Sequence, residues 1–479
     1  MRYESAFAQR GRGAQMNAIV FLVAALLLGG CVSLSEDGGF GAVQSVVREH
    51  TGKDARWVRN EADAQSVRGA VSTLLAKPLS VDDAVQIALL NNAGLQASYA
   101  ELGIAEGELV AASRFPNPRF SYLRARHDDE IKVESILSFN LLALLTVPLA
   151  TEAGKRRFEQ VKAQAANEAL RVAAETRRAY FQALAAAELA RYMEQVKQAA
   201  EASAELARRM AGVGNLPRLS QMREQAFYAD ATAQLARARQ SALSERERLT
   251  RLMGLWGDDA RFALPERLPE LPAAPRELEN AEQLALERRL DVRAARREAE
   301  MLAESLGLTR VTRFMNVFEL GAVRVSESPE PRKRGYEVGF EIPLFDWGGG
   351  RVARAESLYM QAANRIAETA VIARSEVRET YAGYRTAYDV ARHYRDEVVP
   401  LRKRISDEVL LRYNGMLASA FELLADAREQ VASVSATMEA LRDFWLAESD
   451  LQSALAGKGA GMGATPRAGV AAAPAARGH

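Results

Sequence analysis

Hydrophobic and polar positions along the chain predict very long helices joined to short amphipathic strands. The stretch from about Gly154 to Gly212 has no proline and no interior glycine, and consists largely of Ala, Arg, Glu, Gln and Leu. The stretch from Arg351 to Tyr413 has a similar composition and one proline, Pro400. At 1.5 Å per residue each would be a helix of roughly 90 Å, and Pro400 predicts a bend or break in the second. Helices of this length need lateral partners throughout.

Turn residues separate each long helix from a shorter one. Gly212 to Pro217 interrupts the first long helix and Asn414-Gly415 interrupts the second, after which helical patterns resume over 219–253 and 420–455. Alanine fills many apolar positions of the first long helix, between residues 163 and 187. Small residues let neighbouring helices approach closely, which favours a thin-walled helical tube over a solid bundle.

Four short stretches have the pattern of strands. From Tyr336 to Ile342, apolar residues alternate with glutamate or glycine, so one face of the strand is apolar and the other polar. Residues 119–126 and 316–325 alternate less cleanly, and 134–145 ends as an apolar run. The alternation fits a transmembrane barrel strand with Glu337 and Glu341 toward a watery lumen. It fits a half-buried strand of a soluble sheet equally well.

Four strands per chain are too few to close a barrel. Because an open sheet edge is not viable in a bilayer, the membrane interpretation requires oligomerisation, and three chains would supply twelve strands. Each strand pair is followed by a proline and a glycine that open a long helix, Pro148 with Gly154 and Pro343 with Gly348. Proline ends ladder pairing and its fixed φ suits a first helical turn, so these four residues are predicted strand–helix junctions.

The same plan occurs twice along the chain. Residues 79–154 and 278–350 each run from a helical approach through two strand-like stretches to the proline and glycine of a long helix. Farther on, Arg209 to Gly212 matches Arg412 to Gly415, and the offset between matched anchors drifts only from 195 to 203. Since chance resemblance between alanine-rich helices would not hold one register, we interpret residues 79–275 and 276–456 as two copies of one unit.

The N-terminus has the features of a cleaved export signal. An apolar run over residues 19–28 follows three arginines and precedes Cys31, the single cysteine of the chain. Ten apolar residues are too few to span a membrane and suit a signal-peptide core, whether translation starts at Met1 or at Met16. The segment Leu28-Gly29-Gly30-Cys31 resembles a bacterial lipoprotein box, in which the cysteine thiol is diacylated and the signal before it, residues 1–30, is removed. An ordinary signal peptide with an incidental cysteine is the alternative.

The remaining segments carry little pattern. Residues 31–78 have low periodicity and several Ser, Gly and Asp, and are predicted to form an extended, lipid-anchored arm. Ser80 is able to cap a helix that starts after it. Residues 457–479 are rich in Gly, Ala and Pro and lack an apolar pattern, which predicts a disordered tail.

Composition and motifs argue against an enzyme or a nucleic-acid-binding protein. The net charge is +1, and it becomes about −1 once residues 1–30 are removed, because this segment holds three Arg and one Glu. Such a balance gives no electrostatic attraction for nucleic acid. The four histidines are far apart and no catalytic, phosphate-binding or metal-ligand spacing is present, so we expect no cofactor and no bound metal.

The anchors together resemble the TolC-type outer-membrane efflux family. The resemblance rests on Asn91-Asn92 closing an amphipathic helix, on residues 288–291 at the equivalent place in the second copy, and on residues 343–348 after the fourth strand. It covers about residues 79–456. It implies a mixed α+β membrane protein: a homotrimer whose twelve-stranded outer-membrane barrel continues into a helical tube in the periplasm, docked to an adaptor protein and an inner-membrane pump. Met315 and Val317 replace the prolines expected before the third strand.

Two sets of residues become candidate sites. In the family the tips of the tube contact the adaptor, so the resemblance makes the two turns docking candidates, at Arg209, Gly212, Gly214, Arg412, Gly415 and Leu417. These glycines also serve a helix reversal if they adopt positive φ. Glu422 and Asp426 lie at i and i+4 on one helix face, and threefold repetition would make an acidic, cation-attracting gate. An ordinary solvated helix face is the alternative for this pair.

We expect a passive outer-membrane export channel of a tripartite efflux system, driven by its partners. The alternatives are the channel of a type I protein secretion system and, in another class, a periplasmic coiled-coil scaffold without a pore. The strand-like stretches and their prolines argue against the scaffold. The opening helix and residues 114–118 resemble the heavy-metal export branch more than the drug efflux branch, while the exported substrate stays open.

Overall fold

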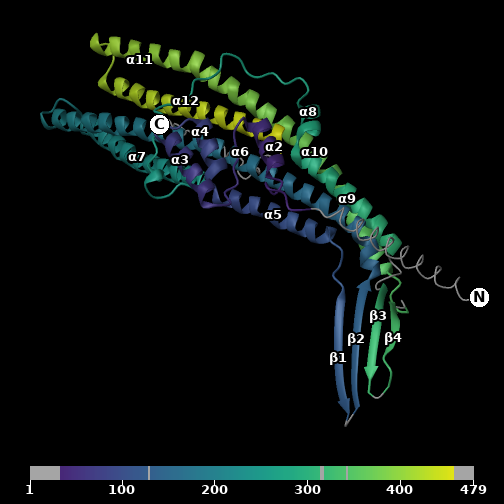
Figure 1. Ribbon diagram of the computed structural model, residues 1–479. Helices are drawn as coiled ribbons and strands as arrows, with labels where there is room; N and C mark the ends of the chain where they lie inside the picture. Colours follow the sequence, from purple (N-terminus) through teal and green to yellow (C-terminus); the bar gives the residue numbers. More distant parts are fainter. Residues whose placement is uncertain (1–32, 128–129, 313–317, 329, 341–343, 458–479) are drawn as a thin grey trace, which may run out of the picture. The chain divides into compact units, whose positions relative to one another are not determined.

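A computed structural model describes residues 33–127, 130–312, 318–328, 330–340 and 344–457 (Figure 1). Cys31, Pro343 and all but the first residue of the predicted tail lie outside these ranges. The chain divides into two compact units. Unit 1 comprises Met1–Ala42, Tyr99–Ala163 and Ala294–Ile366, and unit 2 comprises Val43–Ser98, Gln164–Arg293 and Ala367–His479.

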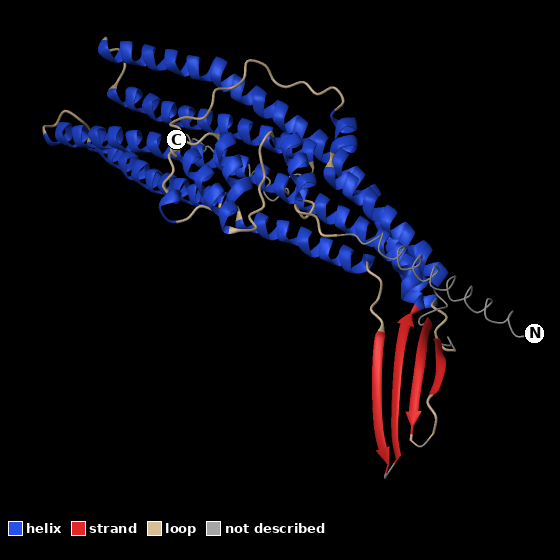
Figure 2. Ribbon diagram, in the orientation of Figure 1, coloured by secondary structure: helices blue, strands red, loops and turns tan. Residues whose placement is uncertain are grey.

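Unit 1 contains one antiparallel sheet of four strands, drawn red in Figure 2. The strands are β1 (Arg119–His127), β2 (Glu130–Asn140), β3 (Phe318–Glu327) and β4 (Lys333–Phe340), and they pair in sequence order. The register aligns Phe120 with Leu137, Leu137 with Ala322, and Ala322 with Tyr336. The strands thus form at the four strand-like stretches predicted from the sequence.

The helical part of unit 1 comes from segments of longer helices. These are α2 (Phe40–Thr51), α5 (Ala93–Ser113), α6 (Leu141–Gly212), α9 (Leu290–Thr312) and α10 (Gly349–His393). Phe40 packs edge-on against Tyr99, with ring centroids 4.8 Å apart. A Cβ at Gly154 would lie 3.1 Å from Leu109 Cδ1, so glycine lets α6 approach α5 closely.

The prediction of an extended arm over residues 31–78 is wrong in its conformation. Two helices form there, α2 and α3 (Glu61–Leu75). Asn60 caps α3 by accepting a hydrogen bond from Asp63 N at 2.8 Å. Each helix buries a valine pair spaced i, i+4, Val43 with Val47 and Val67 with Val71. Helix α2 also buries Phe40, so the buried apolar stripe has three residues in α2 and two in α3, and such short stripes give only a weak periodicity.

Unit 2 is built from helices with a buried apolar core. It adds α4 (Val81–Asn91), α7 (Arg218–Met253), η1 (Gly257–Ala260), α8 (Ala281–Arg288), η2 (Tyr394–Val398), α11 (Val399–Asn414) and α12 (Ala420–Ala456). One cluster joins α4, α6 and α7 through residues such as Ile87, Leu184 and Leu249, and another joins α10 and α12 through Tyr388 and Phe444. Several alanines of the predicted seam are buried: Ala165, Ala166, Ala169, Ala179 and Ala183.

The first long helix begins earlier than predicted. Strand β2 ends at Asn140 and α6 starts at Leu141, so Pro148 lies inside the helix instead of at its junction with the strand. The run Leu141–Leu145 is apolar throughout, and periodicity cannot distinguish a strand from a helix in such a run. With 72 residues, α6 is about 108 Å long.

The second long helix changes its winding where Pro400 predicts a bend or break. The α-helical hydrogen bonding of α10 gives way to a π-helical turn over Tyr394–Val398, and Pro400 occupies the first turn of α11. Proline has no N–H to donate and its ring crowds the carbonyl four residues earlier. A wider turn just before Pro400 accommodates both effects.

Candidate functional site

The sheet of unit 1 has two chemically distinct faces. Residues directly opposite in an antiparallel pair lie on the same face, and residues two apart along a strand share it. By this rule one face, called the apolar face below, carries large hydrophobic side chains that are all exposed: Phe120, Tyr122, Leu137, Phe139, Leu320, Tyr336, Val338 and Phe340. Tyr336 is 83% exposed.

The other face carries every carboxylate of the four strands. These are Glu130, Glu134, Glu319, Glu327 and Glu337, and Lys132 and Lys333 lie on the same face. The two lysines have carboxylate partners there, because Lys132 contacts Glu134 at 3.6 Å and Lys333 contacts Glu327 at 3.9 Å. All five strand carboxylates therefore project from the face opposite the apolar face.

The junction after β4 exposes further apolar groups. Leu344, Phe345 and Trp347 are all exposed before α10 begins at Gly349. Gly348 has φ 74 and its N–H donates to Asp346 Oδ1 at 2.8 Å, so this turn uses a conformation that favours glycine. Gly348 lies directly before the long helix, as predicted, whereas Gly154 lies well inside α6.

The first turn between long helices, in unit 2, reverses the chain between Gly212 and Arg218. Gly214 carries the positive φ, at 81°. Asn215 N and Gly214 N donate to the carbonyls of Met210 and Ala211, which ends α6. Arg209 donates to Glu205 at 2.8 Å, and both side chains stay accessible.

The second turn has a matching ion pair and a different left-handed residue. Arg412 donates to Glu408 at 2.8 Å, as Arg209 does to Glu205. Gly415 has φ −78, so the interpretation that it supplies positive φ is wrong. Met416 takes that conformation instead, with φ 62, and Leu417 N then donates to Arg412 O at 2.8 Å. Met416 and Leu417 are 94% and 82% exposed.

The structure gives each member of the predicted acidic pair a partner within the chain. Glu422 closes a capping box at the start of α12: it accepts from Ser419 N at 2.9 Å while Ser419 Oγ accepts from Glu422 N at 3.3 Å. Asp426 accepts a hydrogen bond from Ser406 Oγ of α11. Glu422 is exposed and Asp426 is half-buried.

Two buried ionic clusters of unit 2 have no counterpart in the sequence predictions. Glu224 is buried and accepts from Ser203 Oγ and from Arg428 Nη2, each at 2.8 Å. Arg289 is fully buried and binds Asp291 at 2.7 Å and Glu376 at 2.8 Å. Charged residues are mostly exposed, so the sequence predicts a surface position for a charged residue in an alanine- and arginine-rich helix. Only the structure shows which of them are buried in an ionic cluster.

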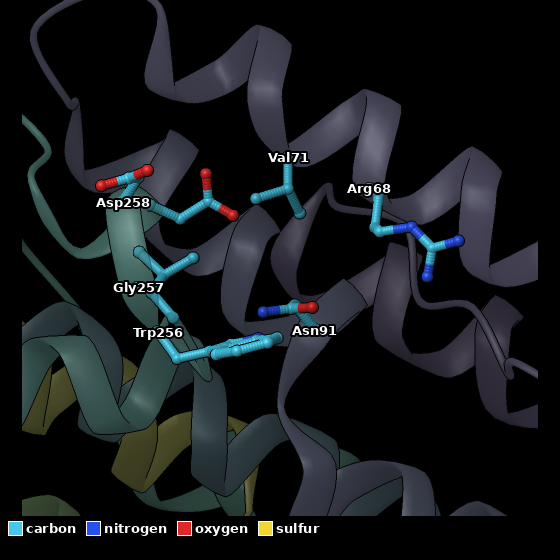
Figure 3. A pocket seen from close by; sticks show the side chains of 8 residues that line it. Arg68, Val71, Asn91, Trp256, Gly257 and Asp258 are labelled. Carbon is cyan, nitrogen blue, oxygen red and sulfur yellow. The ribbon is translucent and has the colours of Figure 1, made fainter.

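A cavity of about 270 Å³ lies in unit 2, bordered by the loop that follows α7 (Figure 3). Its lining includes Arg68, Asn91, Trp256 and Asp258, and Figure 3 shows the Trp256 ring beside Asn91. Among the described residues no group of His, Cys, Asp and Glu is arranged to hold a metal ion. Within the same ranges, none of the helices is both long enough and apolar enough to cross a membrane.

Known structures share this architecture. CusC, whose structures concern folding and transmembrane channel formation, aligns with a TM-score of 0.65 at 16% identity over 79% of this chain and 92% of its own. The outer-membrane channel OprN aligns with a TM-score of 0.66 at 18% identity, over 81% of this chain and 92% of its own. The chain therefore has the fold of the TolC-type outer-membrane channels, with its long helical part.

A relative is also found by sequence. The cobalt-zinc-cadmium resistance protein CzcC of Cupriavidus metallidurans is 26% identical over 299 residues. The alignment covers 58% of this chain and 66% of CzcC, slightly less than two thirds of that relative's length. No protein-family model matches the chain.

Proposed function

We propose that this chain is the outer-membrane channel of a tripartite efflux system, a passive, non-enzymatic conduit. The observation that carries the proposal is the two-faced sheet: a face of exposed aromatic and aliphatic residues opposite a face with all five strand carboxylates. Such alternation suits strands with lipid on one side and water on the other. A soluble protein would leave this apolar face uncovered at a cost in solubility.

The active assembly is a homotrimer. Strands β1 and β4 are the two edges of the sheet, and each leaves one row of backbone groups without a strand partner among the described residues. In hydrocarbon such groups have no water to bond, so the edges must be joined by another copy. Three copies close a twelve-stranded barrel, whose lumen continues between the long helices of the two repeats, residues 79–275 and 276–456.

The two turns of unit 2 dock a periplasmic adaptor, which couples the channel to an inner-membrane pump. Both turns present an accessible Arg–Glu pair, and the second adds the exposed Met416 and Leu417. Exposed apolar residues rimmed by charged pairs are typical of protein interfaces. Arg209, Gly212, Gly214, Arg412, Gly415 and Leu417 form this docking surface.

Anchoring and gating complete the proposal. Acylation of Cys31 holds the N-terminus at the outer membrane, and mass spectrometry of the purified N-terminus tests it: an unmodified Cys31 contradicts lipidation. Glu422 and Asp426 give the pore entrance its negative charge, even though both have partners in the chain. The substrate is a divalent heavy-metal cation, supported by the similarity to CzcC. Type I protein secretion is the less favoured alternative.

One experiment separates the channel from a scaffold. Native mass spectrometry of the full chain in detergent should give a trimer, and planar bilayers containing it should show ion conductance. A monomer, or a trimer without conductance, contradicts the channel. Deleting the gene should then increase sensitivity to Co²⁺, Zn²⁺ or Cd²⁺ without affecting secreted proteins, while the reverse result favours protein secretion.

A further inference from the structure

Four arginines interrupt the apolar face of the sheet at one end. Arg124 and Arg126 lie in the last part of β1, Arg324 lies in the second half of β3, and Arg334 is the second residue of β4. The register places all four on the face that carries Phe120 and Leu137. All four are close to the β1–β2 and β3–β4 hairpins and exposed. We call these residues the arginine patch.

Two members of the patch are direct cross-strand neighbours. Arg324 pairs with Arg334 in the ladder of β3 and β4, which puts their Cβ atoms about 5 Å apart. Like charges directly opposite each other in a sheet are destabilising. The sheet therefore contains a destabilising pair of like charges, and a neutral residue at either position would remove the repulsion.

The described strands hold no negative charge that would neutralise this pair. All five of their carboxylates project from the opposite face, as the register shows. Neither Arg324 nor Arg334 forms an ion pair with another described residue. Lys333, next to Arg334 in sequence but on the opposite face, pairs with Glu330 at 2.5 Å. Closing the barrel does not change this, because the neighbouring β1 brings only more arginine to the apolar face.

No carboxylate of the described strands supplies the missing negative charge, so Arg324 and Arg334 offer their positive charge to a ligand in the adjoining medium. On the apolar face the adjoining medium is lipid, with acyl chains beside Leu320, Val338 and Phe340. The hairpins lie at the strand ends opposite the long helices, so helices in the periplasm direct the hairpins to the outer leaflet. Guanidinium groups bind phosphate bidentately, and Arg is preferred over Lys for that geometry.

We propose that the arginine patch binds the phosphate groups of a phosphorylated glycolipid of the outer leaflet, whose acyl chains lie along the apolar face. The inference rests on the proposed function, since it requires the sheet to be a wall of an outer-membrane barrel. It adds a ligand that the channel assignment does not require. Arg324 and Arg334 form the centre of the site, and Arg124 extends it across β2.

The test uses the full-length chain, with lipid A carrying two phosphates as the probe and dephosphorylated lipid A with the same acyl chains as its control. Native mass spectrometry titrations of the trimer in detergent give the dissociation constant. Arg324→Gln with Arg334→Gln should weaken binding of the phosphorylated lipid at least tenfold and leave the dephosphorylated lipid unchanged. Arg324→Lys with Arg334→Lys should give an intermediate loss, because the bidentate geometry is lost and the charge is kept.

The matched control changes the same number of charges on the same sheet. Lys132→Gln with Lys333→Gln lies on the carboxylate face and should alter binding less than twofold. Equal binding of both lipids to the wild-type chain, or unchanged binding in the arginine variant, overturns the proposal. The mass of the protein in the same spectra distinguishes failure of the lipid site from failure of the channel assignment. A trimer that binds both lipids equally refutes only the lipid site.

Discussion

Asn92 and Arg289 hold matching positions in the two halves of unit 2. Each follows a short opening helix, and its backbone N–H donates to a carbonyl of that helix, Ala88 O at 3.0 Å or Ala285 O at 2.9 Å. Each side chain then reaches a carbonyl near the end of a returning helix: Asn92 Nδ2 donates to Leu252 O at 2.9 Å and Arg289 Nη1 to Ala454 O at 3.0 Å. A neutral amide in the first half corresponds to a charged guanidinium in the second, which explains the carboxylates around Arg289.

We expect Arg289→Ala to destabilise the protein by about 3–5 kcal/mol, because it leaves Asp291 and Glu376 without their buried counter-charge. Asn92→Ala removes only neutral hydrogen bonds and should cost about 1 kcal/mol. Thermal unfolding in detergent measures both. Combining Arg289→Met with Asp291→Asn and Glu376→Gln should recover most of the loss, and equal destabilisation by the single and triple changes would contradict this account.

Substitutions in the two turns should differ in their effect on the melting temperature. Gly214 has φ 81, so Gly214→Ala introduces left-handed strain of about 1 kcal/mol and should lower the melting temperature. Met416 already carries such strain at φ 62, so Met416→Gly should not lower it. The same Met416→Gly variant should bind the adaptor more weakly, as surface plasmon resonance would show. Unchanged binding would show that Met416 does not contact the adaptor.

Neutralising the acidic pair should reduce cation selectivity while the helix start stays intact. Glu422→Gln keeps the capping box, since Gln also completes it, and Asp426→Asn keeps an acceptor for Ser406. Carboxylate repulsion and cation attraction of about 1 kcal/mol per pair correspond to roughly fivefold in selectivity, with a larger effect at low salt. Reversal potentials in planar bilayers measure it. The control is Glu429→Gln, which neutralises an exposed carboxylate of the same helix, α12, that pairs with Arg402 of α11. An equal loss of cation selectivity in the control and in the Glu422 and Asp426 variant would argue against a gate.

The start of α2 should lose stability in acid. The N–H groups of Gly41 and Gly39 donate to Asp37, at 2.9 and 3.0 Å, and hold the pKa of this carboxyl below its usual 3.8. A carboxyl whose pKa is lower in the folded state than in the unfolded state stabilises the fold at pH values above its unfolded-state pKa. This stabilisation is lost as the pH falls through the folded-state pKa. Hydrogen exchange of the two amides, corrected for intrinsic rates, should therefore accelerate below pH 3.8. Asp37→Asn should remove that step, and a step that persists in the variant would assign it to another group.

Elements with a regular pattern were predictable from the sequence, and those decided by tertiary contacts were not. All four strands were located, but clean alternation marked only the fourth, where a two-faced sheet imposes period two on its residues. The start of α6 was misplaced, since the uniformly apolar run Leu141–Leu145 has no period to interpret. Helices α2 and α3 were missed because their buried apolar stripes are short, with three residues in α2 and two in α3.

The candidate sites also include features that were predictable from the sequence and features that were not. The positions of both turns followed from Gly212 to Pro217 and Asn414-Gly415, but the left-handed residue of the second turn did not. Helix α11 runs on to Asn414 and closes through Leu417 N and Arg412 O, which places Met416 where glycine would be expected. The buried Arg289 was equally invisible, since the sequence does not reveal which arginine of an arginine-rich segment faces the core.

The π-helical turn Tyr394–Val398 lies where the two copies of the proposed duplication differ in length. In the proposed duplication Tyr381 corresponds to Tyr180 and Arg412 to Arg209, yet the second interval is two residues longer (412 − 381 against 209 − 180). A π-helical turn takes up one inserted residue without unfolding the helix, so the turn within this interval accounts for one of the two. An insertion within the second long helix after the two halves diverged would produce such a π-helical turn. Any residue-by-residue comparison of the halves should therefore open its gap at Tyr394–Val398 instead of in a loop.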